Sequence, residues 1–124
     1  MEDTLQKTEA QIDDQAFALG ELLKEHNGQE TSVMNLRGIS NWTDFFIITT
    51  VSSRTHMDGL ERHIKDYCRS NDIEILGNSG SKRKSGDVDD EWRLIDLGFI
   101  VIHLMTKRVR EFYDLERLWR PTSV

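Results

Sequence analysis

The 124-residue chain is predicted to fold as an α/β domain, with about five strands in a single mixed sheet and helices packed on that sheet. Three observations predict this class. Helical periodicity alternates with β-rich segments along the chain. Two of the β-rich segments, FFIITTV at 45–51 and FIVIHLM at 99–105, are almost continuous in β-branched and apolar residues. Hydrophobic residues make up 37% and charged residues 31%, which fits one core beneath a charged surface, so we expect residues 1–124 to form a single domain.

The first helix is expected at about residues 8–26. Its apolar positions recur at helical spacing, at Ile12, Ala16, Leu19 and Leu23. Thr8 and Gln11 form a capping-box pattern, and Gly28 is placed to end the helix. Eight acids and two lysines fall within residues 1–30, so this segment accounts for the whole net charge of -6. A basic partner would be attracted to it.

Two strands and a second helix are expected next. Residues 33–36 are a short strand candidate, and after a turn near Gly38 the run 45–51 should be a buried, central strand. Helical spacing returns at 55–70, where Thr55 and Asp58 are able to cap the start. This helix is a candidate for a right-handed crossover between strands.

The C-terminal half is expected to hold three strands and a last helix, at residues 73–76, 91–96, 99–105 and 106–118. A loop rich in glycine and serine, at about 77–90, separates the first two of these strands. The tight turn at Leu97-Gly98 should join the next two as a hairpin. The complete order is α-β-β-α-β-β-β-α.

No catalytic or cofactor-binding motif is visible, so neither a cofactor nor a metal is expected. Phosphate-binding glycine loops are absent, and the four histidines lack the close spacing of zinc hydrolases. The single cysteine, Cys68, excludes an intramolecular disulfide and fits a reducing compartment. The chain shows no secretory signal and no run of about 18 apolar residues, so a cytoplasmic protein without membrane segments is expected.

Two features leave alternatives open. His103 lies within an apolar run, where it is either a hydrogen-bonded core histidine, a residue at a partner-binding face or, least favoured, a catalytic base. Lys82, Arg83 and Lys84 form the basic cluster of the chain. They are either part of a solvated loop or a contact for RNA phosphates, and nearby acids weaken the second alternative.

Three motifs resemble those of the Iojap-related family of ribosomal silencing factors. The run TDFFIITT at 43–50 resembles the family pattern T-D-x-x-I-I-x-T. Residues 92–103 resemble W-x-x-x-D-x-G-x-x-x-x-H, and residues 110–119 resemble R-x-x-Y-x-L-E-x-L-W. Spaced motifs in the right order are specific, and the resemblance spans residues 41–119.

The resemblance implies a sheet related to the nucleotidyltransferase fold but without its catalytic carboxylates, and a binding protein in place of an enzyme. It implies that the chain binds the large ribosomal subunit through ribosomal protein L-fourteen, sterically blocks joining of the small subunit and so represses translation. The positions carried over as partner-binding are Asp44, Trp92, Asp96, His103, Tyr113, Leu115, Glu116 and Trp119. The alternative for Leu115, Leu118 and Trp119 is packing of the last helix on the core. A contact of Lys82, Arg83 and Lys84 with ribosomal RNA stays open.

Two other functions are weighed against this one. An enzyme acting on a nucleotide with magnesium would need two carboxylates on adjacent strands, of which Asp96 is well placed and Glu91 lies at a strand edge. A self-associating structural protein would use the exposed edges of a small sheet. A homodimer is compatible with either function.

Overall fold

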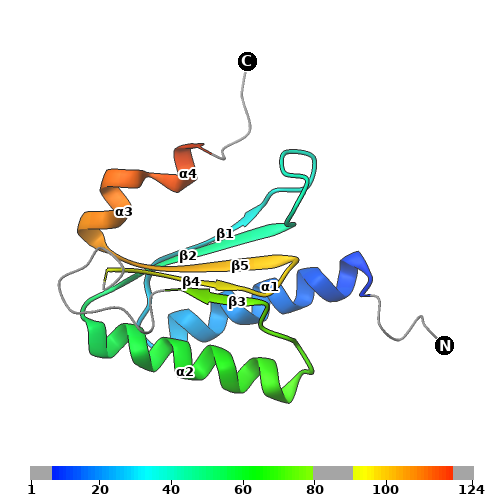
Figure 1. Cartoon of the computed structure of the whole chain (residues 1–124), viewed down its shortest axis with the longest axis horizontal. Coiled ribbons are helices and arrows are strands. Elements are labelled where there is room, and N and C mark those ends of the chain that lie inside the picture. Colours follow the sequence, from blue (N-terminus) through cyan, green and yellow to red (C-terminus); the bar gives the residue numbers. More distant parts are fainter. Residues whose placement is uncertain (1–6, 80–90, 119–124) are drawn as a thin grey trace.

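The computed structural model describes residues 7–79 and 91–118, which form a five-stranded sheet with helices on it (Figure 1). The strand order is β1-β2-β5-β4-β3. In chain order the elements are α1 (Glu9–Glu25), β1 (Gln29–Asn35), β2 (Phe45–Val51), α2 (Arg54–Ser70), β3 (Gly77–Ser79), β4 (Trp92–Asp96), β5 (Ile100–Thr106), α3 (Lys107–Tyr113) and α4 (Leu115–Leu118). The predicted α/β class is confirmed.

The sheet is mixed because β2 and β5 run parallel at its centre. They pair along their whole length, from Phe45 opposite Ile100 to Val51 opposite Thr106. The other neighbouring strands are antiparallel, and β4 and β5 form the predicted hairpin. Helix α2 carries the chain from β2 to β3 at the far edge, so the strands it connects are not neighbours.

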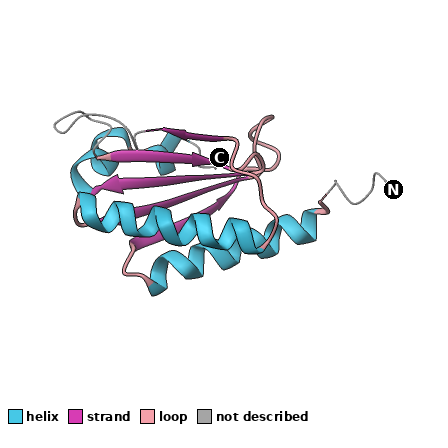
Figure 2. Ribbon diagram, turned by 60° about the horizontal axis from the view of Figure 1, so that its bottom comes forward, coloured by secondary structure: helices cyan, strands magenta, loops and turns pink. Residues whose placement is uncertain are grey.

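Helices α1 and α2 cover one face of the sheet and enclose the main core (Figure 2). Fully buried side chains come from both layers, including Leu19, Leu23, Leu60 and Ile64 of the helices and Ile47, Ile95 and Ile102 of the strands. Each such side chain contributes about 1.5–3 kcal/mol by leaving water. The capping box at the start of α1 is present, with Thr8 and Gln11 bonded reciprocally. Ser53, rather than Thr55, caps α2 by accepting from the backbone N–H of His56.

The expected position of the third strand is wrong: β3 occupies Gly77–Ser79 and not residues 73–76. Asp72 leaves α2 with a left-handed backbone, φ 54°, and the chain must then return to the sheet edge. Ile73 and Ile75 pack against the main core on the way, which explains their apolar character without a strand. The expected loop at 77–90 therefore begins inside a strand, and most of it lies outside the described residues.

Two further boundaries differ from expectation. Strand β1 begins at Gln29, not at residue 33, because polar residues pair with β2 along the edge, and a register irregularity lies between Gln29 and Ser32. The single helix expected at 106–118 is broken at Asp114, whose φ of 48° is left-handed and cannot continue α3. Helix α4 then starts in a new direction.

Candidate functional site: the open face of the sheet

The second face of the sheet carries α3 and α4 at one end, on the side away from α1 and α2 (Figure 1). Successive strand residues point to opposite faces, so this face is formed by alternate positions of the three inner strands. They are Phe46, Ile48 and Thr50 of β2, Val101, His103 and Met105 of β5, and Trp92, Leu94 and Asp96 of β4. Val109 and Leu115 of the last two helices pack on Ile48 and Met105. We call this surface the open face.

Aromatic rings form a connected row across the open face. In spatial order they are Trp42, Phe46, His103, Trp92, Tyr113 and Phe112, with successive ring centroids 5.8, 4.6, 6.0, 4.8 and 4.9 Å apart. These separations and their tilted or edge-to-face geometry are those that aromatic pairs prefer. Phe46 and His103 in the middle of this aromatic row are buried and Trp92 is half-buried, whereas the ends are exposed: Trp42 by 56%, Tyr113 by 44% and Phe112 by 78%.

His103 is a core histidine with a hydrogen bond to a neighbouring strand. The indole Nε1 of Trp92 donates to His103 Nδ1 at 3.1 Å. Burial lowers the pKa of His103 from 6.5 to about 4, so the ring is neutral. Its other nitrogen, Nε2, is buried and has no hydrogen-bond partner among the residues described. Of the alternatives that the sequence left open, the structure shows the first.

The acid of β4, Asp96, is engaged within the chain. Its Oδ1 accepts the backbone N–H of Gly98 at 2.8 Å and so closes the β4–β5 turn. Gly98 has φ 92°, a conformation that a residue with a side chain rarely adopts. Asp96 therefore lies on the open face while part of its hydrogen-bonding capacity serves the turn.

Glu116 holds α4 against α3. Its Oε1 accepts from Arg110 Nη2 at 2.9 Å and Nε at 3.2 Å, while Arg110 Nη1 donates to Thr50 Oγ1 at 3.0 Å. A groove of about 470 Å³ lies beside this pair, and acids outnumber bases along it: it is lined by Glu30, Thr31, Ser32, Thr50, Lys107, Arg110, Glu111, Asp114 and Glu116.

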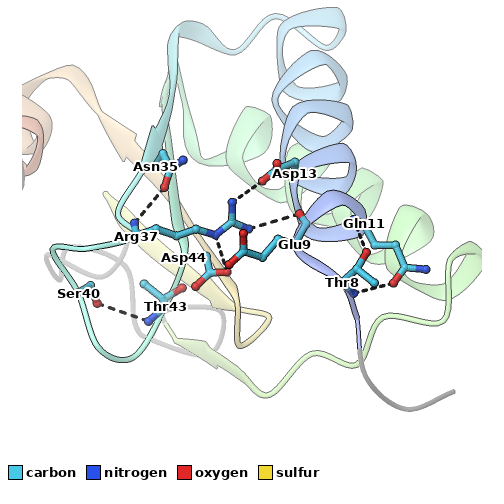
Figure 3. Close-up of polar contacts among 9 residues, drawn as sticks. All are labelled: Thr8, Glu9, Gln11, Asp13, Asn35, Arg37, Ser40, Thr43 and Asp44. Carbon is cyan, nitrogen blue, oxygen red and sulfur yellow. Dashed lines mark hydrogen bonds and ion pairs between the residues drawn. The ribbon is translucent and has the colours of Figure 1, made fainter. Parts of the chain in front are cut away.

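Asp44 lies in a separate polar cluster that ties the β1–β2 loop to α1 (Figure 3). Arg37 is its centre, donating to Asp44 Oδ2 at 3.0 Å and to Asp13 Oδ1 at 2.7 Å. The guanidinium of Arg37 also lies 5.1 Å from the centroid of the Phe45 ring. Asp44 thus fixes the entry of β2. No sequence signal pointed to Arg37, because its two acids are brought together only by the fold.

Four of the eight residues expected to bind a partner come together at one end of the open face, where α3 and α4 meet the sheet: Trp92, His103, Tyr113 and Leu115. Glu116 lies at the same end but pairs with Arg110, while Asp96 closes the β4–β5 turn and Asp44 lies in the β1–β2 loop. Trp119 and the basic cluster Lys82, Arg83 and Lys84 lie outside the described residues. Phe46 and Phe112 also belong to the aromatic row, and the motifs do not predict this because both residues occupy unspecified positions of the patterns.

Within residues 7–79 and 91–118, no group of three or more His, Cys, Asp or Glu side chains is arranged to hold a metal ion. In the same ranges, no helix has the length and apolar character needed to cross a membrane. Glu91, the acid at the start of β4, is engaged by Thr106 and Arg108, and the hydrogen bond from Arg108 lowers its pKa.

Fold and site together define a small α/β protein that buries one sheet face under helices and displays aromatic side chains on the other. The chain belongs to the ribosomal silencing factor family: residues 9–124 match the family described as "Ribosomal silencing factor during starvation". The Iojap-related resemblance of the sequence motifs is thereby confirmed.

Similar proteins support this membership. The ribosomal silencing factor of Treponema pallidum is 30% identical over 109 residues, which cover 88% of this chain and 93% of the relative. That of Halalkalibacterium halodurans is 33% identical over 95 residues, covering 77% and 76%. A crystal structure of a protein from Chromobacterium violaceum superposes with a TM-score of 0.75 at 23% identity, covering 90% of this chain and 88% of that one, and shows the same fold.

Proposed function

We propose that this protein represses translation by docking its open face on the large ribosomal subunit, through ribosomal protein L-fourteen, so that the small subunit cannot join. Membership of the silencing factor family supports a regulatory role at the ribosome. The observation that carries the docking surface is the aromatic row, whose middle is buried and whose ends are exposed.

The exposed ends of the aromatic row have the chemistry of interface anchors. Tryptophan and tyrosine are enriched among the residues that dominate binding energy, because they bury a large rigid surface and still offer a polar group. Phe112 and Tyr113 contact each other edge-to-face at the end of α3, and Tyr113 rests on Trp92. An apolar side chain of the partner would be sheltered from water on this platform.

Charge beside the platform favours a basic partner. Glu30, Glu111 and Asp114 line the groove next to α3 and α4, where Arg110 is already paired with Glu116. Lysine and arginine side chains of a partner would meet complementary charge there while its apolar side chains cover the rings. The acidic α1 segment lies on the opposite, helix-covered face and is not part of this surface.

The contacts of its acids give no support to the enzyme alternative. Asp96 and Glu91 are the acids that a magnesium site would have used. The first closes a turn through Gly98, and the second pairs with Arg108 across the start of α3. Neither is arranged with a second carboxylate on an adjacent strand: Asp96 is opposite Val101 on one side and Gly77 on the other.

Co-sedimentation with isolated large subunits tests the proposal. The protein should pellet with large subunits at micromolar concentration or below and remain in the supernatant with small subunits. When preincubated with large subunits, it should reduce the fraction of joined ribosomes after small subunits are added. Absence of binding at micromolar concentration would overturn the proposal, as would binding that leaves joining unaffected.

The partner within the large subunit is tested separately. Cross-linking from a photoreactive group introduced at Phe112 should label ribosomal protein L-fourteen. Labelling of another component would overturn the choice of partner while leaving large-subunit docking in place.

A thermal-shift series with magnesium and nucleotides tests the enzyme alternative, because a ligand at 100 times its dissociation constant stabilises by about 2.7 kcal/mol. No shift is expected.

A further inference from the structure

His103, Trp92 and Tyr113 link β5, β4 and the end of α3. Trp92 lies diagonally across the β4–β5 pair from His103, because Leu94 is the residue directly opposite the histidine. A diagonal neighbour is within reach of an aromatic side chain. The indole accordingly bonds to His103 through Nε1 and contacts the Tyr113 ring at 4.8 Å between centroids.

The chemistry of this hydrogen bond fixes the state of the histidine. An indole N–H can only donate, so His103 Nδ1 must be the acceptor and the proton must lie on Nε2. A doubly protonated imidazolium could not accept this bond. The neutral ring is the form that burial favours, since it lowers the pKa to about 4.

The contacts of the His103 ring indicate a role inside the protein and not a direct contact with a partner. Nε2–H is buried, with no partner among the described residues, although leaving a buried donor unpaired is costly. What the side chain does provide is one acceptor for Trp92 and a ring edge against Phe46, 4.6 Å away between centroids. At 3% exposure it offers a partner almost no surface.

Trp92, which is hydrogen-bonded to His103, also contacts α3 and α4. It packs with Leu115 against the small cluster of Ile48, Met105 and Val109 that seats α3 and α4 on the sheet. Tyr113, which rests on the indole, is the last residue of α3 before the chain turns at Asp114. The orientation of the indole therefore bears on where Tyr113 and Phe112 are presented.

We propose that His103 is a positioning residue of the docking surface: by accepting the indole N–H it fixes the orientation of Trp92, on which Tyr113 rests. The partner contacts Trp92, Tyr113 and Phe112, whereas His103 acts through Trp92 and is not touched. The claim that a partner contacts these rings rests on the proposed function. The claim that His103 orients Trp92 concerns the free protein alone.

The first test uses the free protein and three variants. His103→Asn keeps an acceptor, because Oδ1 of asparagine occupies nearly the place of Nδ1. His103→Leu is similar in size but has no acceptor. Trp92→Phe removes the donor and identifies the Trp92 indole signal in ¹H–¹⁵N spectra by its loss. Solvent exchange of that indole proton should become about fivefold or more faster in His103→Leu and stay near the wild-type rate in His103→Asn, since a net hydrogen bond corresponds to a factor of roughly this size.

The second test measures affinity for large subunits. His103→Leu and Trp92→Phe should each weaken binding by about tenfold, and the double variant should be no weaker than the worse single variant, because both remove the same bond. His103→Asn should bind within about twofold of wild type, as expected if the acceptor is what matters. If His103→Leu does not fold, His103→Val, which also lacks an acceptor, replaces it and should show the same faster indole exchange and the same loss of affinity.

The outcomes separate the two claims. Equal indole exchange in wild type, His103→Asn and His103→Leu would overturn the positioning role, whatever the ribosome measurement gives. Equal losses of affinity in His103→Asn and His103→Leu would overturn it as well, because the acceptor would then be irrelevant. Failure of the wild-type protein to bind large subunits would overturn the proposed function alone.

Discussion

Arg93 of β4 and Glu61 of α2 form an ion pair between the sheet and the helix layer, with Arg93 Nη1 2.7 Å from Glu61 Oε1. Both residues are buried, at 1% and 5% exposure. The same nitrogen also donates to Asp58, and Glu61 receives further bonds from Lys65 and Asn78. Burial would raise the pKa of Glu61, but hydrogen bonds from Lys65 and Asn78 and the charge of Arg93 hold it below its usual value.

Removing one member of this pair should be strongly destabilising. Glu61→Ala leaves Asp58 as the acid paired with the buried Arg93 charge within the described residues. We expect a loss of about 3 kcal/mol in the free energy of unfolding, measured by urea denaturation. Asp58→Ala is the matched control, because Asp58 is half exposed and its loss should cost about 1 kcal/mol or less. Equal costs for the two variants would contradict a special role for the buried pair.

Stability should fall in weakly acidic solution because of His103. The unfolded chain takes up this proton near pH 6.5 and the folded chain only near pH 4. The contribution of His103 to the free energy of unfolding is therefore fully present above pH 6.5. It is lost as pH falls from 6.5 to 4, by about 3 kcal/mol at most. The difference in unfolding free energy between wild type and His103→Asn, followed over this range, should show that slope. A constant difference would argue against a neutral buried imidazole.

The Arg110–Glu116 pair should set how firmly α4 is held. Glu116→Gln removes the charge that Arg110 contacts through two nitrogens, and the pair is partly exposed, so the cost should be about 1 kcal/mol or less. The effect should be local: faster amide exchange in α4 with little change in α1 and α2. Glu111→Gln, an exposed residue of α3, is the control and should leave α4 exchange unchanged.

Asp44 should prove to be a structural residue. Asp44→Asn weakens the contact with Arg37 inside the β1–β2 loop, while the Arg37–Asp13 pair, which ties this loop to α1, stays intact. We expect a loss of about 1 kcal/mol or less in stability and no change in affinity for large subunits. Both are measured on the same preparation, by thermal unfolding and by co-sedimentation. A loss of affinity without a loss of stability would contradict this prediction and indicate that Asp44 contacts the partner.

Most of the fold follows from periodicity. Strands β2 and β5 are long apolar runs at the centre of the sheet, and α1 and α2 carry apolar residues at helical spacing, so each element has one strong local signal. Strand β3 has none: Gly77, Asn78 and Ser79 disfavour strands, and they are extended because the backbone of β4 is there to pair with them. The break at Asp114 has no strong local signal either; it is accompanied by the contact of Glu116 with Arg110, which only the folded chain brings together.

The site could be predicted only in part. The motif positions Trp92, His103 and Tyr113 do meet on one surface, but sequence spacing does not say which residue is buried and which is exposed. His103 is buried inside the row, whereas Phe112, at an unspecified position of the family pattern, is its most exposed member. Asp44, Asp96 and Glu116 are expected to bind a partner because they match the family motifs. Sequence spacing does not reveal that each of them accepts a hydrogen bond from a donor within the chain.

The central claim, that the open face docks on the large subunit, is tested most directly by comparing two exposed phenylalanines on opposite faces. Phe112 is 78% exposed beside Tyr113, and Phe17 is 58% exposed on α1, on the helix-covered side. Affinity for isolated large subunits should fall by about tenfold or more in Phe112→Ala, as for an interface anchor. It should be unchanged in Phe17→Ala. The reverse pattern, or equal affinity in both variants, would contradict docking through the open face.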